Sequence, residues 1–294
     1  MLIRCLLLIM LAASVSAKPQ LTWLQTDWPP HQIVSGPFQG QGTFDLLQQQ
    51  LIAKMPQFSH HNKLVSLARL EQAFIQQDSA LCVLGTLYSD QRAQSRLFST
   101  PMAVGPALAV GYLSTSLSQH PAMQTEGADI SVLALDRHLT GAYQPNRLYP
   151  PVVTSALLHP QTNLSRHTFT SEVNAAALLA SGRVNYVVEY PERMQYYNQL
   201  LPEAVVMEHR AIIGANVASV SYVTCSQDDV GRAAITAVNQ VLPVLWQQAE
   251  YLQAMQRWLD DSARRRLSTE MQTLQQQALM QLQPRPHDTV DAGH

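Results

Sequence analysis

The stretch ALCVLGTLYSDQRAQSRLFSTPM, residues 80–102, is the part of the chain that decides the fold. Residues 80–87 are mostly apolar and favour β-structure, which predicts a buried strand. A polar loop follows this strand and contains Arg92. In open α/β folds, ligands bind at the edge of the sheet where the parallel strands end. The loop is therefore expected to lie at a ligand-binding edge.

Strand-like and helix-like segments alternate on both sides of this stretch. Apolar runs predict further strands over residues 21–25, 63–66, 130–135, 184–188 and 218–224. The spacing of apolar residues predicts helices over residues 44–54 (with Thr43 as N-cap), 68–77, 171–181, 230–242, 245–259 and 262–281. This alternation predicts an α/β fold in which mostly parallel sheets are flanked by helices.

The N-terminus has the features of an export signal. Arg4 precedes a short apolar run over residues 6–13, and Val15, Ser16 and Ala17 supply small residues at a cleavage position. The run is too short to span a bilayer. We therefore expect a signal peptide over residues 1–17 and a mature chain that is free in the periplasm. At the other end, residues 284–294 are polar and rich in Pro, which predicts a disordered tail.

Charge and motifs exclude several classes of function. The 19 basic and 21 acidic residues leave no positive excess for binding nucleic acid. No later stretch is long and apolar enough to insert into a membrane. The motifs G-x-S-x-G, H-E-x-x-H, the phosphate-binding loop and the dinucleotide fingerprint are absent from the sequence. We therefore predict no catalytic residue, metal ligand or cofactor, and expect a protein that is not an enzyme. We also expect a monomer.

Two cysteines, Cys82 and Cys225, follow the export signal, and both lie in apolar, strand-like stretches. In an oxidising compartment, an even number of cysteines suggests a disulfide. Two buried free thiols, which pack like small apolar side chains, fit the same residues equally well. The residues alone leave both possibilities open.

The loop after the strand also carries a spaced motif. A hydroxyl residue, Ser89, stands three positions before Arg92, and Phe98-Ser99 follows six positions after it, with Pro101 close behind. In this order the residues resemble the signature of the family 3 periplasmic solute-binding proteins, the amino-acid-binding type. The segments TDWPPHQI (26–33), AALLASGRVNYVVEYP (176–191) and SVSYVTCSQDDVGRAAITAVNQVL (219–242) resemble further parts of that family. The resemblance thus covers nearly the whole mature chain.

The resemblance implies a periplasmic-binding-protein-like type II fold with two α/β lobes joined by two crossovers. Lobe one is expected to comprise residues 18–110 and 218–283, where the second part includes the C-terminal helices, and lobe two is expected to comprise residues 111–217. The third strand and the returning strand are neighbours in this fold. The resemblance therefore favours a Cys82–Cys225 disulfide.

The resemblance also implies ligand-binding residues. The matching arginine of the family holds the ligand's carboxylate, and the guanidinium of Arg92 offers the planar fork that this requires. Trp28 and Tyr88 follow predicted strands, where an aromatic ring can form a wall of the cleft. Thr140 matches a second-lobe turn at which a hydroxyl and a helix start receive an anion. Glu189 lies in the region where the family places an aspartate for the ligand's ammonium.

Each of these residues also has a plainer interpretation. Arg92 fits a surface arginine in a polar loop, although Arg96 fits that description better. Trp28 fits a lid over the local core beside its prolines, and Tyr88 is open to the same interpretation. Glu189 fits a solvated acid in a loop.

Two departures from the family pattern bear on the ligand. The family commonly has a hydroxyl residue five positions before the arginine, where this chain has Leu87. The adjacent Thr86 is therefore the candidate ligand-binding hydroxyl, although it should point the other way if the strand continues. Tyr190 stands where the family's aspartate would align most directly, next to Glu189. The resemblance implies a carboxylate-bearing, amino-acid-like ligand, and these two departures argue against an ordinary α-amino acid.

The expected function is the capture of a small ligand by hinge closure of the two lobes, on behalf of an ABC transporter or a membrane sensor. One alternative is a periplasmic lyase on the same fold, similar to the cyclohexadienyl dehydratases, in which Glu189 with a raised pKa would be the general acid. Another alternative is a ligand-free sensing or interaction module.

Overall fold

The computed structural model describes residues 17–145, 147–169 and 173–282. The predicted signal peptide, apart from Ala17, and the predicted disordered tail lie outside these residues. Within them, no helix is long and apolar enough to cross a membrane.

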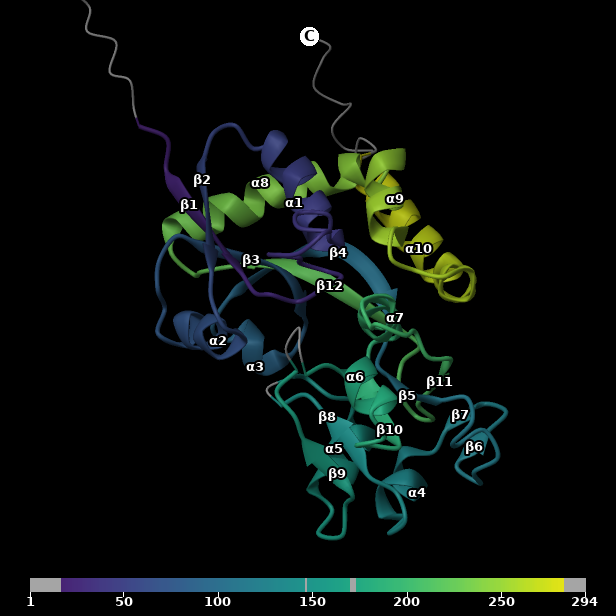
Figure 1. The fold of residues 1–294 in the computed structure, drawn as a ribbon. Coiled ribbons are helices and arrows are strands. Elements are labelled where there is room, and N and C mark those ends of the chain that lie inside the picture. Colours follow the sequence, from purple (N-terminus) through teal and green to yellow (C-terminus); the bar gives the residue numbers. More distant parts are fainter. Residues whose placement is uncertain (1–16, 146, 170–172, 283–294) are drawn as a thin grey trace, which may run out of the picture.

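A five-stranded sheet forms the first of two layered bodies (Figure 1). Its order is β2-β1-β3-β12-β4. The strands are β1 (Gln20–Gln25), β2 (Ser59–Leu64), β3 (Leu81–Leu87), β4 (Leu97–Pro106) and β12 (Ala218–Cys225). β1 pairs in parallel with β2 and β3, whereas β12 runs antiparallel to both β3 and β4. Because β12 comes from late in the sequence, both ends of the chain build this sheet, which we call lobe one together with its helices.

A second five-stranded sheet, of order β11-β5-β10-β8-β9, forms lobe two. Its strands are β5 (Ala109–Leu113), β8 (Gly141–Tyr143), β9 (Leu164–Arg166), β10 (Tyr186–Glu189) and β11 (Met207–Ala211). The strands β8, β9 and β10 are parallel, and β5 is antiparallel to β10. The chain crosses between the sheets twice, from β4 to β5 and from β11 to β12. This is the two-lobed α/β arrangement that the sequence predicts, while the boundaries proposed at 110/111 and 217/218 stay predictions.

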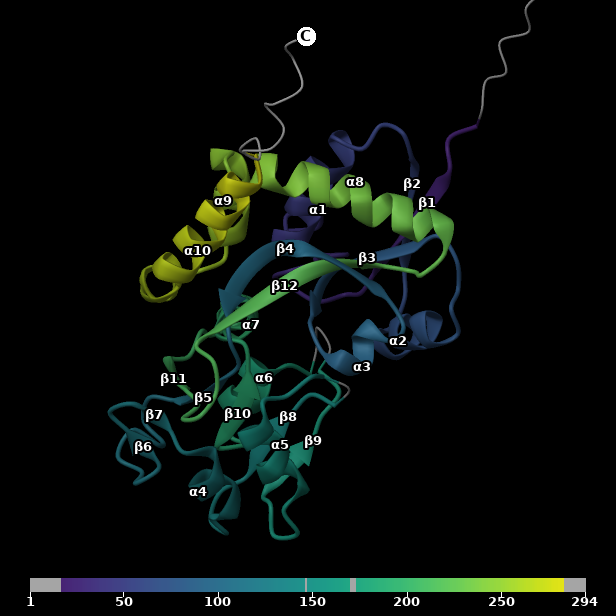
Figure 2. The same ribbon diagram turned by 180° about the vertical axis from the view of Figure 1, so that it is seen from behind.

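Helices from both ends of the chain cover lobe one (Figure 2). They are α1 (Thr43–Ala53), α2 (Leu67–Ile75), α3 (Asp90–Ala93), α8 (Asp229–Leu245), α9 (Ala249–Gln256) and α10 (Asp261–Leu282). The long helix α10 packs against α8 and β4, and its apolar residues Leu267 and Met271 are buried in the same core as Trp23. Helical spacing of the apolar residues explains this arrangement, since Leu267 and Met271 lie four positions apart on one face.

Lobe two has helices of no more than nine residues and one small ribbon. The helices are α4 (Ile130–Leu135), α5 (Pro151–Leu158), α6 (Ala175–Ala180) and α7 (Pro191–Gln199), and the ribbon pairs β6 (Met123–Gln124) with β7 (Gly127–Ala128). The prediction of a strand over residues 130–135 was wrong, because Asp129 caps a helix there by accepting hydrogen bonds from the backbone N–H groups of Ser131 and Val132. Short apolar runs of this kind fit a strand and a helix equally well.

Helix α7 ties lobe two to lobe one. Tyr196 and Tyr197 on α7 are buried in an apolar cluster with Ile33, and Phe38 and Trp258 of lobe one pack against that cluster. The aromatic rings of Tyr196 and Trp258 lie 5.3 Å apart. The lobes therefore share an apolar contact beside the two crossovers.

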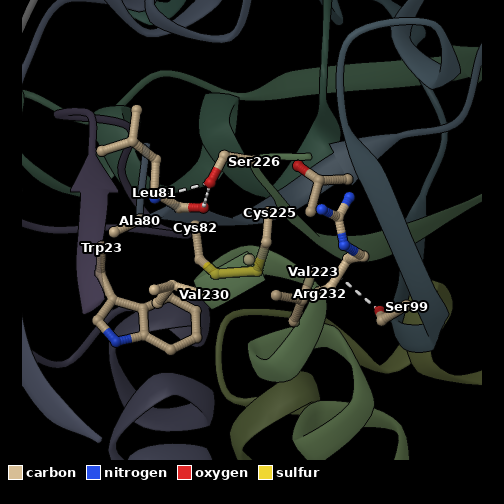
Figure 3. The surroundings of a disulfide bond; sticks show 12 residues. Trp23, Ala80, Leu81, Cys82, Ser99, Val223, Cys225, Ser226, Val230 and Arg232 are labelled. Atoms are coloured by element: carbon tan, nitrogen blue, oxygen red, sulfur yellow. Dashed lines mark hydrogen bonds between the residues drawn. A yellow bond between two sulfur atoms is a disulfide. The ribbon is translucent and has the colours of Figure 1, made fainter. Parts of the chain in front are cut away.

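Cys82 of β3 and Cys225 of β12 form a disulfide (Figure 3), as the resemblance predicted. The two residues face each other in the antiparallel pairing of these strands, and both side chains are fully buried. Figure 3 shows the indole of Trp23 beside the bridge. The bridge links positions that are 143 residues apart, so it closes a loop that contains the whole sheet of lobe two.

Candidate functional site

The loop after β1 carries Trp28 to the junction of the lobes. This loop closes on itself through backbone hydrogen bonds between Trp28 and Gln32. The indole of Trp28 lies 6.2 Å from the ring of Tyr190, which follows β10 in lobe two. The guanidinium carbons of Arg147 and Arg193 each lie 5.7 Å from the same indole. Trp28 therefore joins the two lobes through one aromatic side chain and two cations.

Glu189 lies at the carboxyl end of β10 and is held by two arginines. Its Oε1 lies 2.5 Å from Nη1 of Arg147, and its Oε2 lies 3.0 Å from Nη2 of the same residue. Nε of Arg193 approaches Oε2 to 3.3 Å, and the backbone N–H of Tyr190 donates to Oε1. All three charged side chains are at most 6% exposed. Bidentate pairing of this kind is the strongest geometry available to an arginine and a carboxylate.

The charges of this buried cluster do not cancel. Burial by itself disfavours the charged form of Glu189, but Arg147 and Arg193 outweigh it and hold the pKa of Glu189 below its ordinary value. Burial also raises the pKa of Tyr190 to about 12, so this phenol stays neutral at physiological pH. Two guanidinium groups and one carboxylate leave one net positive charge on this cluster.

Arg92 begins a second cluster, in lobe one. Its Nη2 donates to Oε1 of Glu71 at 3.0 Å, and its Nη1 donates to the backbone oxygen of Leu87 at 3.1 Å. Ser89 caps the short helix α3 by accepting a hydrogen bond from the backbone N–H of Arg92. Arg96 donates to Oε2 of the same glutamate at 2.6 Å. Glu71 is thus shared between two arginines.

The interpretation of Arg96 as a surface arginine was wrong. Its side chain is 1% exposed, and its guanidinium carbon lies 4.2 Å from the centre of the Phe74 ring. Burial lowers the pKa of Arg96, against the opposing effect of Glu71. Arg92, by contrast, is 19% exposed. Arg92 is therefore the member of this pair that solvent and ligand can reach.

A cavity of about 50 Å³ lies between the two clusters, and we call it the Arg92 cavity. Three of the residues predicted from the sequence line it together, namely Trp28, Thr86 and Arg92. Arg147 and Tyr190 line it from lobe two. The hydroxyl of Thr86 lies 2.9 Å from the hydroxyl of Thr224, so its hydrogen bond is made within the sheet. Arg92 and Arg147 also line a wider outer groove of about 850 Å³, from opposite lobes.

The structure does not bring Tyr88 and Thr140 to this cavity. Tyr88 is 53% exposed, and its hydroxyl donates to Asp90 on the outside of α3. Thr140 precedes β8, where the resemblance predicted a helix start. Since β8 and β10 are parallel, Thr140 lies at the opposite edge of the sheet from Glu189. Glu189 itself is buried behind Arg147 and does not line the cavity.

Sequence reasoning missed the two arginines of lobe two. Arg193 stands four positions after Glu189, and this spacing is the one signal that pointed to their pairing. Arg147 lies in an irregular loop without a motif. In the described ranges, no group of three or more His, Cys, Asp or Glu side chains is arranged to hold a metal ion.

Comparison of the sequence with protein-family models and with curated proteins found no match. Solved structures, however, match at the level of the fold. The substrate-binding protein of an amino acid ABC transporter has 18% identity and a TM-score of 0.60, and the match covers 82% of this chain and 99% of that protein. A histidine kinase sensor domain with similarity to periplasmic binding proteins has 16% identity and a TM-score of 0.63, over 82% and 96% of the two chains.

A third neighbour is an amino acid ABC transporter substrate-binding protein from Streptococcus pneumoniae, solved bound to L-arginine. It has 15% identity and a TM-score of 0.61, and the match covers 82% of this chain and 94% of that protein. At these identities the likeness concerns the fold. The chain therefore has the two-lobed α/β fold of the periplasmic binding proteins, the fold that its resemblance to family 3 predicted.

Proposed function

We propose that this chain is a periplasmic solute-binding protein that captures a small carboxylate-bearing ligand between its lobes. The observation that carries the proposal is the position of Arg92, which lines a cavity that both lobes build. A guanidinium at this place offers two parallel N–H groups to a carboxylate. The solved neighbours, which serve amino acid transporters, support a ligand of the same general class.

The shared carboxylate of Glu71 suggests how Arg92 becomes available. Arg92 and Arg96 both donate to Glu71, and Arg96 is buried while Arg92 is partly exposed. A ligand carboxylate can replace Glu71 as the partner of Arg92, while Glu71 keeps its hydrogen bond to Arg96. The exchange costs little, because partly exposed ion pairs contribute only about 0–1 kcal/mol.

The charge of lobe two favours the same class of ligand. In the family resemblance, a carboxylate of lobe two holds the ligand's α-ammonium, but here both oxygens of Glu189 are occupied by arginines. Arg147 lines the Arg92 cavity together with Arg92, so the cavity is positive on two sides. This arrangement supports a carboxylate-bearing ligand that does not place an α-ammonium at Glu189.

Ligand entry requires the lobes to separate. A volume of about 50 Å³ has room for only a few non-hydrogen atoms, since one water needs about 10–15 Å³. The two crossovers, one after β4 and one before β12, are the segments about which the lobes would rotate. Closure onto the ligand would then present a distinct shape to a transporter or a sensor, and neighbours of both kinds share the fold.

The lyase alternative is not part of the proposal. It required Glu189 to be a proton donor with a raised pKa, whereas the flanking arginines lower the pKa of Glu189. A carboxylate of this kind holds no proton at neutral pH.

A binding screen with a matched pair of variants tests the proposal. The mature chain is titrated calorimetrically and by thermal shift with small carboxylates, amino acids and amines, and the screen is repeated with Arg92→Ala and Arg69→Ala. Arg69 is an exposed arginine on α2, close in sequence to Glu71, and it controls for the loss of one positive charge. A carboxylate should raise the Tm of the wild type and of Arg69→Ala, but not that of Arg92→Ala. Carboxylate binding that survives in Arg92→Ala, or the absence of any shift in the folded wild type, would contradict the proposal.

A further inference from the structure

A second cavity adjoins the Arg92 cavity and has different chemistry. Its volume is also about 50 Å³, and we call it the hinge cavity. The two cavities share Trp28, Gly85, Leu87 and Tyr190 as lining residues. Its other lining residues come from the loop after β1, from α1 and α7, from the end of β4 and the start of β12, and from the end of α9 and the segment after it. It therefore lies beside the strands that enter and leave the two crossovers.

Three buried polar atoms without a hydrogen-bond partner belong to side chains that line the hinge cavity. They are Oε2 of Glu192, Nδ1 of His31 and Nε1 of Trp28. The side chain of Glu192 is only 3% exposed, and its other oxygen, Oε1, lies 3.2 Å from Nε2 of His31. A buried polar atom without a partner costs about 1–3 kcal/mol, and more when its group is charged. Unpaired buried polar atoms are rare in folded proteins, so each of them calls for an explanation, and a bound ligand that supplies the partner is one.

The neighbouring arginines are engaged elsewhere. Arg193, the residue after Glu192, donates through Nη1 to the backbone oxygen of Pro29 at 2.6 Å and pairs through Nε with Glu189. Arg147 is held by both oxygens of Glu189. A carboxylate oxygen can only accept hydrogen bonds, so Oε2 of Glu192 calls for a donor, and a cationic donor is favoured.

The walls of the hinge cavity fit an organic cation. Trp28, Phe44, Tyr190 and Trp258 line it with aromatic rings, which attract cations and pack against alkyl groups. Phe44 reaches this position because residue 85 is glycine, since a Cβ there would collide with the Phe44 ring. The remaining lining includes Val104, Met255 and Leu259, which are all buried and apolar.

We infer that the hinge cavity is a subsite for a primary ammonium group on a short alkyl chain, with Glu192 as its anionic partner. Oε2 of Glu192 accepts a hydrogen bond from the ammonium, and the aromatic rings enclose the adjoining methylene groups. Because the two cavities share a wall, the occupant that suits both is a chain with a carboxylate at one end and an ammonium at the other. This last step rests on the proposed function, since the carboxylate end is assigned to Arg92.

Three matched compounds separate the two cavities by calorimetry. Pentanoate carries the carboxylate alone, pentylamine carries the ammonium alone, and 5-aminopentanoate carries both. The expected order of affinity for the wild type places 5-aminopentanoate first. Glu192→Gln keeps the size of the side chain and removes its charge, and it should weaken 5-aminopentanoate and pentylamine by about 10- to 100-fold, the loss expected for one charge-assisted hydrogen bond. The same variant should leave pentanoate unchanged.

Two further variants test whether the loss of amine binding in Glu192→Gln comes from the hinge cavity itself. Glu203→Gln removes an exposed carboxylate of lobe two and should change no affinity. Gly105→Leu narrows the hinge cavity sterically without touching Glu192, since Gly105 lines this cavity and a Cβ added there meets no atom within 4 Å. Gly105→Leu should also weaken both amines selectively.

The outcomes for the two cavities are distinguishable. The inference is overturned if the folded Glu192→Gln and Gly105→Leu variants bind both amines as well as the wild type does, even when pentanoate binding remains dependent on Arg92. If pentylamine binding depends on Glu192 while pentanoate does not bind at all, the ammonium subsite stands and the proposed carboxylate function fails.

Discussion

Two clusters of the same composition lie on opposite sides of the cleft, and they differ in how deeply they are buried. Each consists of one glutamate shared by two arginines. The members are Glu71, Arg92 and Arg96 in lobe one, and Glu189, Arg147 and Arg193 in lobe two. In lobe one, Glu71 and Arg92 are 26% and 19% exposed and only Arg96 is buried, at 1%, whereas no member in lobe two exceeds 6%.

The difference in burial separates an exchangeable cluster from a fixed one. A partly exposed ion pair is worth about 0–1 kcal/mol, so Arg92 can leave Glu71 for a ligand. Removing one partner from a buried pair costs about 3–5 kcal/mol, because the remaining charge is left buried without compensation. In lobe two, Arg147 and Arg193 therefore stay paired with Glu189 and keep their net positive charge in place. In lobe one, Arg92 can exchange Glu71 for a ligand.

The largest effect is expected from Glu189→Gln, which breaks the buried cluster. This variant leaves Arg147 and Arg193 buried without their shared carboxylate, so the free energy of unfolding should fall by about 3–5 kcal/mol at pH 7. Denaturant unfolding monitored by circular dichroism measures the change. Glu126→Gln, at an exposed site of lobe two, is the control and should change stability by less than about 0.5 kcal/mol. A similarly small loss in Glu189→Gln would show that the cluster is not a fixed element.

The pH dependence of the same variant sharpens the comparison. The pKa of Glu189 is lower in the folded state than its ordinary value of 4.5, so its contribution to stability is fully present above that value. The contribution is lost as the pH falls through the lowered folded-state pKa. The gap in stability between the wild type and Glu189→Gln should therefore be widest near neutral pH and should narrow below about pH 4.5.

The second largest effect concerns the disulfide, which only the sheet of lobe one contains. Replacing both Cys82 and Cys225 with Ala should lower the free energy of unfolding by about 2–5 kcal/mol, since the bridge constrains a long segment of the unfolded chain. Trp23 and Trp246 lie in the core of lobe one, and Trp23 packs beside the bridge (Figure 3), so the fluorescence of these two residues follows the unfolding of this lobe. A reductant should destabilise the wild type and leave the double variant unchanged. Equal sensitivity of both proteins to the reductant would contradict this assignment.

Features that depend on residues close in sequence could be predicted, whereas most contacts between residues far apart in sequence could not. The strand over residues 80–87 and the arginine after it follow from local pattern, and the disulfide follows from the resemblance, which makes β3 and β12 neighbours. The partners of Arg92 do not follow from either, because Glu71 lies on a preceding helix with no motif of its own. Local sequence pattern also does not predict which side chain of a loop becomes buried. For this reason the prediction that Arg96 is a surface residue was wrong.

The residues that lobe two brings to the cleft were equally hard to predict from local sequence pattern. The match at Thr140 rests on a common dipeptide, and the strand that follows carries it to the far edge of the sheet. Arg147 and Glu192 have no sequence signal, since one lies in an irregular loop and the other opens a helix that carries charged and aromatic residues alike. Their roles depend on the partners that folding brings to each side chain, Glu189 for Arg147 and His31 for Glu192, and these partners are known only once the lobes are placed together.

The smallest change in stability, and a test of the exchange itself, is expected from Glu71→Gln. Breaking the partly exposed Glu71–Arg92 pair contributes about 0–1 kcal/mol, and Arg96, which is 1% exposed, loses its charged partner as well, so the free energy of unfolding should fall by about 1–3 kcal/mol. Ligand binding should respond in the opposite direction. Without the competing carboxylate, Arg92 is free before the ligand arrives, so the affinity for pentanoate should rise about 3- to 10-fold, a gain that corresponds to about 0.7–1.4 kcal/mol.

Calorimetric titration measures this gain, and Glu203→Gln controls for the lost negative charge. If pentanoate binds Glu71→Gln more weakly than it binds the wild type, Glu71 positions Arg92 for the ligand and does not compete with it, and the contrast between an exchangeable and a fixed cluster no longer holds.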